Sequence, residues 1–439
     1  MLDLRLIREQ PEAVGRALAD KGGAELIDQI LGRDVERRRI LKEGEELKAL
    51  RNRASEAIGQ ARRRGEDASN EQARMREVGD RIKTLDADLK AVDEAIETLL
   101  VQVPNVPHPS VPPGKSDDDN VEVRRWGTPR QFDFTPRPHE EVGEALGLLD
   151  MERAGRIAKA RFAIMWGALA RLERALATFM LDLQTREHGY TELWLPHMVN
   201  GETMLKTGQL PKFEDSLFKT VEADEGRTLY LIPTAEVPLS ALHAGEILPE
   251  RTLPRRYTAF SACYRREAGT YGKDTAGLYR VHQFDKCEQV VICRNDVEES
   301  KRWHEEMRRY SEELLQRLNL PYRVIQCCTG DIGVKNAAMM DVETWMPSRQ
   351  SGDDPDSGYG ETHSASRLYE FQARRLNLRY KSADGKLKFV HTQNNTVVAS
   401  PRILIPILEN YQNADGTVTV PEALRKYMNG VERIEPPRK

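Results

Sequence analysis

The stretch CYRREAGTYGKDTAGLYRVHQFDKCE, residues 263–288, decides the fold of this chain. It begins with β-forming residues and two arginines, passes through a glycine-rich segment, and returns to alternating apolar and charged residues. This order predicts two antiparallel strands joined by a long loop. A phosphate-binding P-loop is excluded, because two residues separate Gly269 from Gly272 and Asp274, rather than Ser or Thr, follows Lys273.

Other β-rich runs follow one another without a helix between them, both before and after this hairpin. Such an order predicts an α+β fold, an antiparallel sheet flanked by helices, rather than a doubly wound nucleotide fold. Helices are predicted over 170–189, ending at Gly189, and over 296–318 and 402–411. No Gly-x-Gly-x-x-Gly motif follows a strand, so the sequence gives dinucleotide binding little support.

Length and composition narrow the class of protein. A chain of 439 residues predicts about two or three domains. A net charge of −4 gives no global nucleic-acid signature, so a polyanion would have to meet a local basic patch. We expect neither a signal peptide nor a membrane span, and hence a cytoplasmic protein. The cysteines form no Cys-x-x-Cys pair; zinc held by Cys327, Cys328 and a distant His is conceivable, but we expect no zinc.

The clearest periodic signal lies near the N-terminus. Apolar residues recur at alternating spacings of three and four over more than three heptads, at Met75, Val78, Ile82, Leu85, Leu89, Val92, Ile96 and Leu99. A weaker seam precedes it, and the Gly-, Asp- and Asn-bearing segment 62–70 between them is typical of a turn. The pattern predicts an antiparallel two-helix coiled-coil arm over about 30–100. The predicted domains are 1–103, a proline-rich linker 104–126, and a catalytic domain 127–439.

The charges of the two predicted arm helices differ in sign. The first helix has an excess of Lys and Arg and ends in Arg62, Arg63 and Arg64, whereas the second has an excess of acids. One interpretation is a solvated coiled coil whose charges keep it soluble and in register. The other is that the first helix and its arginine tip contact nucleic-acid phosphates.

Parity places five hairpin side chains on one face of the strands: Arg265, Glu267, Phe284, Lys286 and Glu288. An arginine fork binds phosphate or carboxylate bidentately, the ring can stack on a base, and Glu288 can accept from an ammonium or hydroxyl group. The alternative is a surface hairpin with ordinary salt pairs.

Three other segments add chemistry to the same prediction. Glu236 lies between apolar residues and prolines, so its carboxylate needs partners. Glu361 could bind Mg²⁺. Arg402 follows Asn394 and Thr396 and opens an apolar helix, where it could meet a phosphate or a ring face. Phosphate-binding groups, a stacking ring and a magnesium site fit activation of a carboxylate by ATP, a reaction that depends on positioning and charge neutralisation.

The chain resembles the bacterial class II seryl-tRNA synthetases over essentially its whole length. The opening stretch resembles their motif 2, and TGQLPKFEDSLFK (207–219), IPTAEVPL (232–239), CTGDIG (328–333) and ILENYQ (407–412) resemble further segments in the same order. The resemblance implies ATP-dependent attachment of L-serine to serine tRNA, and to selenocysteine tRNA where one exists, through seryl-adenylate. It also implies a homodimer, in which 170–189 with Pro196 resembles the interface motif 1, and an arm that reaches tRNA on the other subunit.

The resemblance also implies roles for individual residues. The L-serine pocket would comprise Thr234, Ala235, Glu236, Glu288 and Thr396. The ATP site would comprise Arg265, Arg266, Glu267, Val281, Phe284, Glu361, Thr362, His363, Ser364 and Arg402. Among these, Arg265, Glu267 and Arg402 would be catalytic, with Arg265 on the α-phosphate and Phe284 and Arg402 on either side of adenine. Mg²⁺ would lie at Glu361 and Ser364. The tRNA would meet Arg51, Arg53, Arg62, Arg63 and Arg64.

Several positions depart from the family pattern. Motif 3 reads NNTVVASPR (394–402), Ala276 stands where the motif 2 loop usually has Arg, and SASR (364–367) replaces Ser-Cys-Ser-Asn. Two alternatives therefore remain beside tRNA charging. One is a paralogue that activates serine for a specialised acceptor or for antibiotic self-protection, which the tRNA arm argues against. The other is a non-catalytic tRNA-binding protein, which the retained site residues argue against.

Overall fold

The computed structural model describes residues 1–439 except 222–227, 268–276, 353 and 437–439. The described chain forms two compact units, Met1–Val106 and Pro107–Lys439. The boundary lies near the start of the segment predicted as a linker, and the last residues of that segment, Val121–Trp126, form strand β1 of the large sheet. Within the described residues, no helix combines the length and hydropathy that crossing a bilayer requires.

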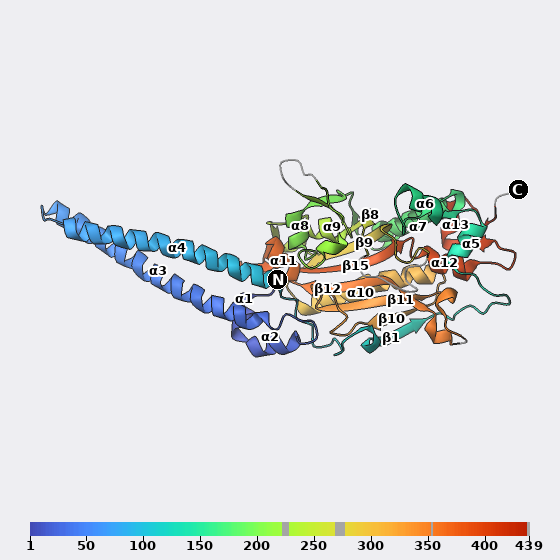
Figure 1. The fold of residues 1–439 in the computed structure, drawn as a ribbon, viewed down its shortest axis with the longest axis horizontal. Helices are drawn as coiled ribbons and strands as arrows, with labels where there is room; N and C mark the ends of the chain where they lie inside the picture. Colours follow the sequence, from blue (N-terminus) through green and yellow to red (C-terminus); the bar gives the residue numbers. More distant parts are fainter. Residues whose placement is uncertain (222–227, 268–276, 353, 437–439) are drawn as a thin grey trace. The chain divides into compact units, whose positions relative to one another are not determined.

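The first unit is built on a two-helix hairpin, as the heptad pattern predicted (Figure 1). Helix α3 spans Leu26–Arg63 and helix α4 spans Ser69–Gln102, so the turn falls within the predicted segment. Helix α4 begins where the Asp67 carboxylate accepts a hydrogen bond from the Ser69 backbone N–H at 2.9 Å. The predicted seam supplies the buried α4 residues Ile82, Leu85, Val92 and Ile96. Helices α1 (Leu4–Glu9) and α2 (Pro11–Ala17) complete the unit.

Three ion pairs join the two long helices across their interface. Arg37 meets Asp93 at 2.6 Å, Glu43 meets Arg81 at 2.6 Å, and Lys48 meets Asp86 at 2.9 Å. Arg62 at the end of α3 donates to Gln72 near the start of α4 at 3.0 Å, whereas Arg37 in the first half of α3 meets Asp93 in the last part of α4, so the helices run antiparallel.

The second unit contains an eight-stranded sheet with the order β1-β10-β11-β12-β15-β9-β8-β4 (Figure 1). Every neighbouring pair is antiparallel except β4 and β8, which confirms the predicted α+β fold. The strands are β1 (Val121–Trp126), β4 (Thr191–Glu192), β8 (Arg255–Tyr264), β9 (Gln283–Cys293), β10 (Tyr322–Gln326), β11 (Ala338–Trp345), β12 (Tyr359–Tyr369) and β15 (His391–Ser400).

Helix α10 (Val297–Arg317) covers one face of this sheet by packing on β12 and β15. It starts at the N-cap residue Asp296, whose carboxylate accepts from the Glu299 backbone N–H at 2.8 Å. The Asn395 amide of β15 donates to the Met307 carbonyl oxygen of α10 at 2.9 Å. Because side chains alternate along a strand, the neighbours of Asn395 on β15 point to the opposite face, where the site described below lies.

The other elements pack around the sheet and its edges. Helix α7 (Gly167–Asp182) contacts β8, β9 and β15, and a π-helical turn, Leu183–Glu187, extends it to the predicted stop at Gly189. The remaining helices are α5 (His139–Ala145), α6 (Met151–Ile157), α8 (Gly201–Lys206), α9 (Glu236–Ala241), α11 (Phe371–Leu376), α12 (Leu404–Tyr411) and α13 (Glu422–Arg425). The remaining strands are β2 (Leu149–Asp150), β3 (Ile164–Met165), β5 (Met198–Asn200), β6 (Leu229–Leu231), β7 (Ile247–Pro249), β13 (Arg379–Lys381), β14 (Leu387–Phe389), β16 (Val418–Thr419) and β17 (Arg433–Ile434).

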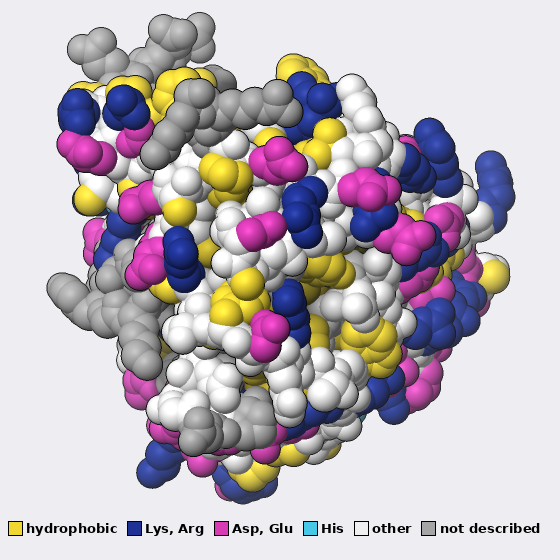
Figure 2. Space-filling model, turned by 90° about the vertical axis from the view of Figure 1, so that its right-hand side faces the viewer, with side chains coloured by type: hydrophobic (Ala, Val, Ile, Leu, Met, Phe, Trp, Pro, Cys, Tyr) yellow, Lys and Arg dark blue, Asp and Glu magenta, His cyan; other side chains and the backbone are white. Residues whose placement is uncertain are grey.

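The surface carries both signs of charge. Figure 2 shows one face, on which Lys and Arg side chains are interspersed with Asp and Glu. This mixture agrees with the small net charge of −4 and leaves no single-sign field on that face.

Candidate active site

A cavity of about 740 Å³ opens on the sheet face opposite α10. Its walls come from β9, β11, β12 and β15, from the residues on either side of the β8–β9 connection, and from loops before α9 and β11. Most residues predicted from the sequence line it, namely Thr234, Glu236, Arg265, Glu267, Val281, Phe284, Glu361, Thr362, Ser364, Thr396 and Arg402.

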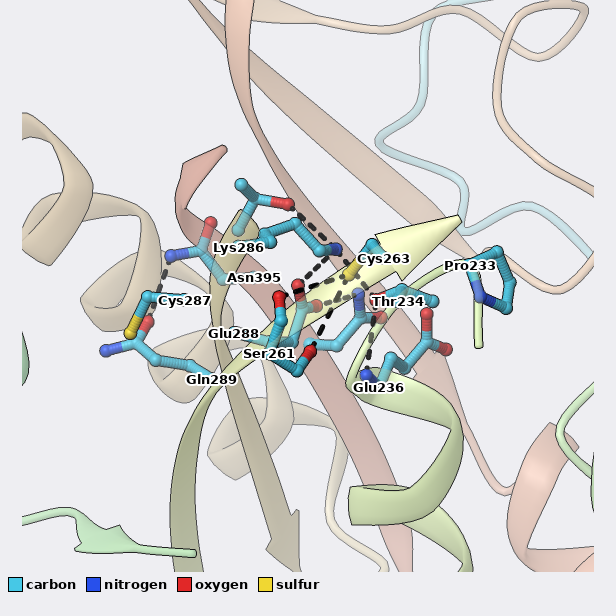
Figure 3. A network of polar contacts seen from close by, with 12 residues as sticks. Pro233, Thr234, Glu236, Ser261, Cys263, Lys286, Cys287, Glu288, Gln289 and Asn395 are labelled. Atoms are coloured by element: carbon cyan, nitrogen blue, oxygen red, sulfur yellow. Dashed lines mark hydrogen bonds and ion pairs between the residues drawn. The ribbon is translucent and has the colours of Figure 1, made fainter. Parts of the chain in front are cut away.

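A buried polar network lies at the inner end of the cavity (Figure 3); Thr234, Glu236, Lys286 and Thr396 line the cavity, whereas the fully buried Glu288 does not. We call Thr234, Glu236, Lys286, Glu288 and Thr396 the inner cluster. The Lys286 ammonium forms an ion pair with Glu288 and donates to the hydroxyl oxygens of Thr234 at 2.7 Å and Thr396 at 3.4 Å. These residues converge because Thr396 of β15 lies opposite Glu288 of β9, while Thr234 directly precedes α9.

The two carboxylates of the inner cluster are almost inaccessible, with Glu288 at 0% and Glu236 at 3% exposure. Glu288 Oε1 accepts from the Asn394 amide at 2.9 Å. Glu236 Oε1 accepts from the Gln372 amide at 2.7 Å and also from the Lys335 ammonium. Each buried carboxylate thus has one lysine and one amide, as the cost of burying an unpaired charge requires.

Cationic and aromatic side chains form a second part of the cavity wall. The Arg265 guanidinium lies 5.1 Å from the centre of the Phe284 ring and donates through Nε to the Pro233 carbonyl at 3.2 Å. Arg402 and Arg349 both lie over the Tyr279 ring, at 4.6 and 4.5 Å from its centre. In the structure, therefore, Arg402 covers Tyr279, and the expected stacking partner Phe284 is covered by Arg265.

Glu267 stands where β8 gives way to the undescribed residues 268–276. Its φ of 46° places a non-glycine residue in the left-handed region. Its carboxylate faces Arg280 at 3.5 Å, and its carbonyl accepts from Arg161 at 3.2 Å. Ionic and hydrogen-bonding contacts thus hold this backbone conformation at the cavity edge.

A bulge brings Glu361 and Ser364 to the same face of β12. Glu343 pairs with Glu361 and Asp341 pairs with Ser364, so Thr362 is an extra residue in β12. Because Asp341 and Glu343 are two residues apart on one strand, both of their partners face the cavity. The Glu361 carboxylate also lies 3.5 Å from Arg402.

Asp341, which pairs with Ser364, offers a further carboxylate beside Glu361. Burial, and next the charge of Glu361, raise the pKa of Asp341 well above its ordinary value. Its Oδ1 is buried with no hydrogen-bond partner among the described residues. Asp341 can also place a ligand atom within 4.8 Å of atoms from Asp331 and Cys327. Hard carboxylate and hydroxyl oxygens with one orphaned atom suit a divalent cation such as Mg²⁺.

Three residues of the predicted site lie elsewhere. Ala235 is fully buried and packs in an apolar cluster with Leu239 and Tyr257, because it immediately precedes α9. Arg266 is exposed, since it alternates with Arg265 along the chain. His363 is 1% exposed, and burial lowers its pKa to about 3, because the bulge turns it away from the cavity.

Several lining residues were not assigned a role from the sequence, among them Lys335, Tyr279, Arg349 and Asp341. Parity along the strand predicted that Lys286 faces the cavity, but the sequence assigned it no catalytic or binding role. Lys335 reaches Glu236 across 99 residues of chain, so no local pattern reveals the contact. For Lys286, the lysine–x–glutamate spacing with Glu288 was a usable signal, since it places both charges on one strand face.

The predicted nucleic-acid contacts lie on the first unit. Arg51, Arg53, Arg62, Arg63 and Arg64 are all exposed. Of these, Arg62 donates to Gln72 at 3.0 Å and Arg64 meets Glu66 at 3.2 Å. The α3 members of the three helix-to-helix ion pairs, Arg37, Glu43 and Lys48, all precede these arginines in the helix. The described distal arginines therefore keep their charge largely uncompensated by α4.

Of the three departures from the family pattern, the one at 364–367 lies in buried structure. Ala365 and Arg367 are 1% and 3% exposed, and the Arg367 guanidinium lies over the Tyr369 ring at 5.2 Å, so these substitutions alter buried packing. Ala276, with Gly269, Gly272 and Lys273, lies outside the described residues.

Comparison with known proteins gives consistent results over both units. The model described as "Seryl-tRNA synthetase N-terminal domain" matches residues 1–107, and "tRNA synthetase class II core domain (G, H, P, S and T)" matches 218–411. A serine–tRNA ligase of Nitratidesulfovibrio vulgaris is 49% identical over 435 residues, covering 99% of this chain and 100% of the relative. One from Pseudothermotoga lettingae is 47% identical over 431 residues, covering 98% and 99%. A crystal structure of seryl-tRNA synthetase from Pyrococcus horikoshii complexed with ATP matches with a TM-score of 0.92 and 40% identity, over 100% of both chains.

Proposed function

This chain belongs to the seryl-tRNA synthetases, and from that premise we propose how its residues divide the work of charging tRNA with serine. It binds ATP, activates L-serine as seryl-adenylate, and transfers the seryl group to serine tRNA. The observation that carries the assignment of residues is the inner cluster, a buried polar pocket beside a wall of arginines and aromatic rings.

The inner cluster would bind serine. Glu236 would accept from the α-ammonium group, while Glu288 and Thr396 would hydrogen-bond to the side-chain hydroxyl. Lys286 holds Glu288, Thr234 and Thr396 in one arrangement and so positions them rather than reacting. An alanine side chain would leave Glu288 and Thr396 without their partner, and a pocket built around a hydroxyl group rejects an analogue that lacks it.

The arginine and aromatic wall would bind ATP. Arg265 would contact the α-phosphate, where negative charge increases as the serine carboxylate attacks. Phe284 would stack on adenine, and Arg402, which lies over Tyr279, would cover the other side of the nucleotide. Glu267 would accept hydrogen bonds from the base or hold the neighbouring arginines. Catalysis would then follow from alignment of carboxylate and phosphate, without a general base.

Glu361 and Ser364 would hold Mg²⁺, with Asp341 close enough to contribute an oxygen ligand. The ion would neutralise phosphate charge and orient the leaving pyrophosphate. Asp341 Oδ1, buried and without a hydrogen-bond partner among the described residues, supports this placement.

The exposed arginines of α3 and its C-terminal end would contact the phosphates and shape of tRNA. Selenocysteine tRNA would be a second substrate where one exists. We also propose that the protein acts as a cytoplasmic homodimer, with α7 and the segment through Pro196 at the interface and each arm serving tRNA on the other subunit.

Aminoacylation of total tRNA with radiolabelled serine, threonine and alanine tests this function. Serine should be attached to its tRNA, while alanine and threonine should give less than about 1% of that rate, since the first lacks the hydroxyl and the second adds a methyl group. Serine-dependent ATP–pyrophosphate exchange without tRNA charging would instead favour a specialised acceptor. Charging with alanine or threonine at a comparable rate would refute the proposed pocket.

A further inference from the structure

Arg349 is a cavity-lining arginine to which the proposed function gives no role. It is the last residue of a short 3₁₀ helix, Pro347–Arg349, in the connection between β11 and β12. Its guanidinium lies over the Tyr279 ring, 4.5 Å from the ring centre. Arg265 and Arg402 of the same cavity are already assigned to ATP, so Arg349 is a further cation at the nucleotide site.

The backbone of β12 makes room for this arginine at Gly360. A Cβ atom at position 360 would lie 2.8 Å from Arg349 Nε and 3.2 Å from the Tyr279 hydroxyl oxygen. Because close-packed atoms do not approach so closely, a side chain at 360 would displace the guanidinium. The φ of Gly360 lies outside the left-handed region, so the backbone conformation does not require a glycine there. The glycine therefore serves to leave space for Arg349.

Hydrogen bonds fix the segment that carries Arg349. The Glu409 carboxylate, which is 0% exposed, accepts from the Ser348 backbone N–H at 3.0 Å and from the Ser348 hydroxyl at 2.8 Å. The Arg349 backbone N–H donates to the Met346 carbonyl oxygen at 3.0 Å. Arg349 also makes a further contact within the chain, but a guanidinium has several N–H donors, so that contact does not prevent it from binding a ligand.

The surroundings of Arg349 place it beside the proposed magnesium site. The Tyr279 hydroxyl donates to the Glu361 carbonyl oxygen at 3.2 Å, and Gly360 directly precedes Glu361. Arg349 contacts the same ring and fills the space at Gly360, so it lies close to the residue that would hold Mg²⁺. Because that Mg²⁺ would orient the leaving pyrophosphate, the outer phosphates of ATP would come within reach of the guanidinium.

We propose that Arg349 binds the outer phosphates of ATP and that Gly360 admits it to the site. This inference rests on the proposed ATP site and adds a residue to it. The guanidinium donates to oxygens of the β- or γ-phosphate, where it stabilises the negative charge that increases as pyrophosphate leaves. Arg265 at the α-phosphate and Arg349 at the leaving group then act on opposite sides of the bond that breaks.

The first test compares ligands that carry the outer phosphates with one that lacks them. Arg349→Met keeps an apolar stem and removes the charge. The KM values for ATP and for pyrophosphate in serine-dependent exchange should each rise about 10- to 100-fold, because charge-assisted hydrogen bonds are lost. 5′-O-[N-(L-seryl)sulfamoyl]adenosine has the serine and adenosine parts but no outer phosphates. Its dissociation constant, measured by titration calorimetry, should stay within about twofold of the wild-type value.

Two further variants give the scale of this effect. Arg349→Lys keeps a positive charge without the planar fork, so its KM for pyrophosphate should lie between those of the wild type and Arg349→Met. Arg251→Met removes an exposed arginine of the same compact unit outside the cavity lining, and should change neither constant. Equal weakening of pyrophosphate and of the analogue in Arg349→Met would indicate a structural role and overturn the proposal. An unchanged KM for pyrophosphate would also overturn it.

Gly360→Ala tests the space for the arginine separately. The added methyl group should displace the guanidinium and raise the KM for pyrophosphate several-fold, while the analogue still binds within about twofold. In an Arg349→Ala background the same substitution should add less than about twofold, because no guanidinium remains to be displaced. The full effect of Gly360→Ala in that background would overturn the role of Gly360.

Failure of the underlying ATP site gives a different pattern of results. Absence of serine-dependent exchange in the wild type, or normal exchange in Arg265→Ala, would refute the proposed ATP site and the role of Arg349 with it. Normal wild-type exchange and a large loss in Arg265→Ala, combined with unchanged constants in Arg349→Met, would overturn the role of Arg349 alone.

Discussion

The helical hairpin and the inner cluster both use ion pairs, but the pairs differ in burial. In the hairpin, the side chains of Lys48 and Asp86 are 48% and 55% exposed. In the inner cluster, the corresponding values for Lys286 and Glu288 are 5% and 0%. Solvent and salt screen the Lys48–Asp86 pair. The Lys286–Glu288 pair is shielded from water and is hydrogen-bonded by other protein groups instead. The same residue types therefore contribute little in one region and determine the geometry in the other.

This difference has a consequence for function. Surface charges on a helix act independently, so a nucleic-acid contact can be spread over several arginines, each replaceable at moderate cost. Buried charges act together, because removing one leaves its partner uncompensated. We therefore expect large, non-additive effects in the cavity and small, additive effects on the hairpin.

The largest effect is expected at Arg265, which faces the cavity over Phe284. Arg265→Ala should lower kcat/KM for serine-dependent ATP–pyrophosphate exchange by at least about 10³-fold, because it removes a cation from the site of increasing phosphate charge. The measurement is initial exchange rate against ATP and serine concentration.

Arg266→Ala is the matched control for Arg265→Ala. The two arginines are adjacent in sequence, but Arg265 lines the cavity and Arg266 points to solvent. Arg266 is exposed, so its loss should cost at least about 100-fold less than that of Arg265. Equal losses at both positions would contradict the placement of Arg265 alone at the ATP site.

The next effect concerns Glu173, a half-buried carboxylate for which the described residues supply no cationic partner. Asp34 of the first unit is buried between Arg8 at 2.8 Å and Arg38 at 3.1 Å. Glu173 of α7 instead hydrogen-bonds to the Ser400 hydroxyl, and burial raises its pKa to about 7. A carboxyl group with a raised folded-state pKa stabilises the protein while protonated and loses that contribution as the pH rises.

The measured quantity is the free energy of unfolding of the wild type minus that of Glu173→Gln. This difference should fall by about 2–3 kcal/mol between about pH 4.5 and pH 7, and then level off. Urea unfolding of both proteins at half-unit pH intervals measures this difference. A difference that is constant across this range, or that grows as the pH rises, would show that the carboxyl group is ionised in the folded protein.

The same contrast explains what the sequence could predict. The hairpin follows from contacts three and four residues apart, so the seam from Met75 to Leu99 predicted the second helix and a weaker preceding seam the first, while the composition of 62–70 predicted the turn. Parity along β9 likewise placed Phe284, Lys286 and Glu288 on one face. The partners of Glu236 could not be predicted, because Lys335 and Gln372 come from 99 and 136 residues away. His363 was predicted at the ATP site but points away from the cavity, because a bulge in β12 reverses the alternation.

A moderate effect is expected at the tip of the hairpin. Replacing Arg62, Arg63 and Arg64 together with Ala should raise the KM for tRNA about tenfold and reduce the slope of log KM against log salt by about two, since each phosphate contact contributes roughly 0.7–0.9. Serine-dependent exchange without tRNA should stay within about twofold, because the substitutions lie in the other compact unit. Aminoacylation at several salt concentrations measures both quantities.

Arg74→Ala with Arg76→Ala is the control, since both residues are exposed on the acidic helix α4. This pair should change the salt slope by less than half as much as the tip variant. An equal change would mean that tRNA responds to the charge of the whole hairpin and not to the basic helix.

The smallest effect is expected for the Lys48–Asp86 pair itself, and it gives the most direct test of the comparison. A double-mutant cycle with Lys48→Ala and Asp86→Ala should give a coupling free energy of about 0.5 kcal/mol, which 0.5 M salt should largely remove. The equivalent cycle with Lys286→Ala and Glu288→Ala should give on the order of 3 kcal/mol with weak salt dependence, because neither partner can regain water when the other is lost. Similar coupling energies would show that burial does not separate the two regions. A large, salt-resistant coupling at Lys48–Asp86 would further indicate that the hairpin has one rigid register, which would strengthen its role in presenting the distal arginines to tRNA.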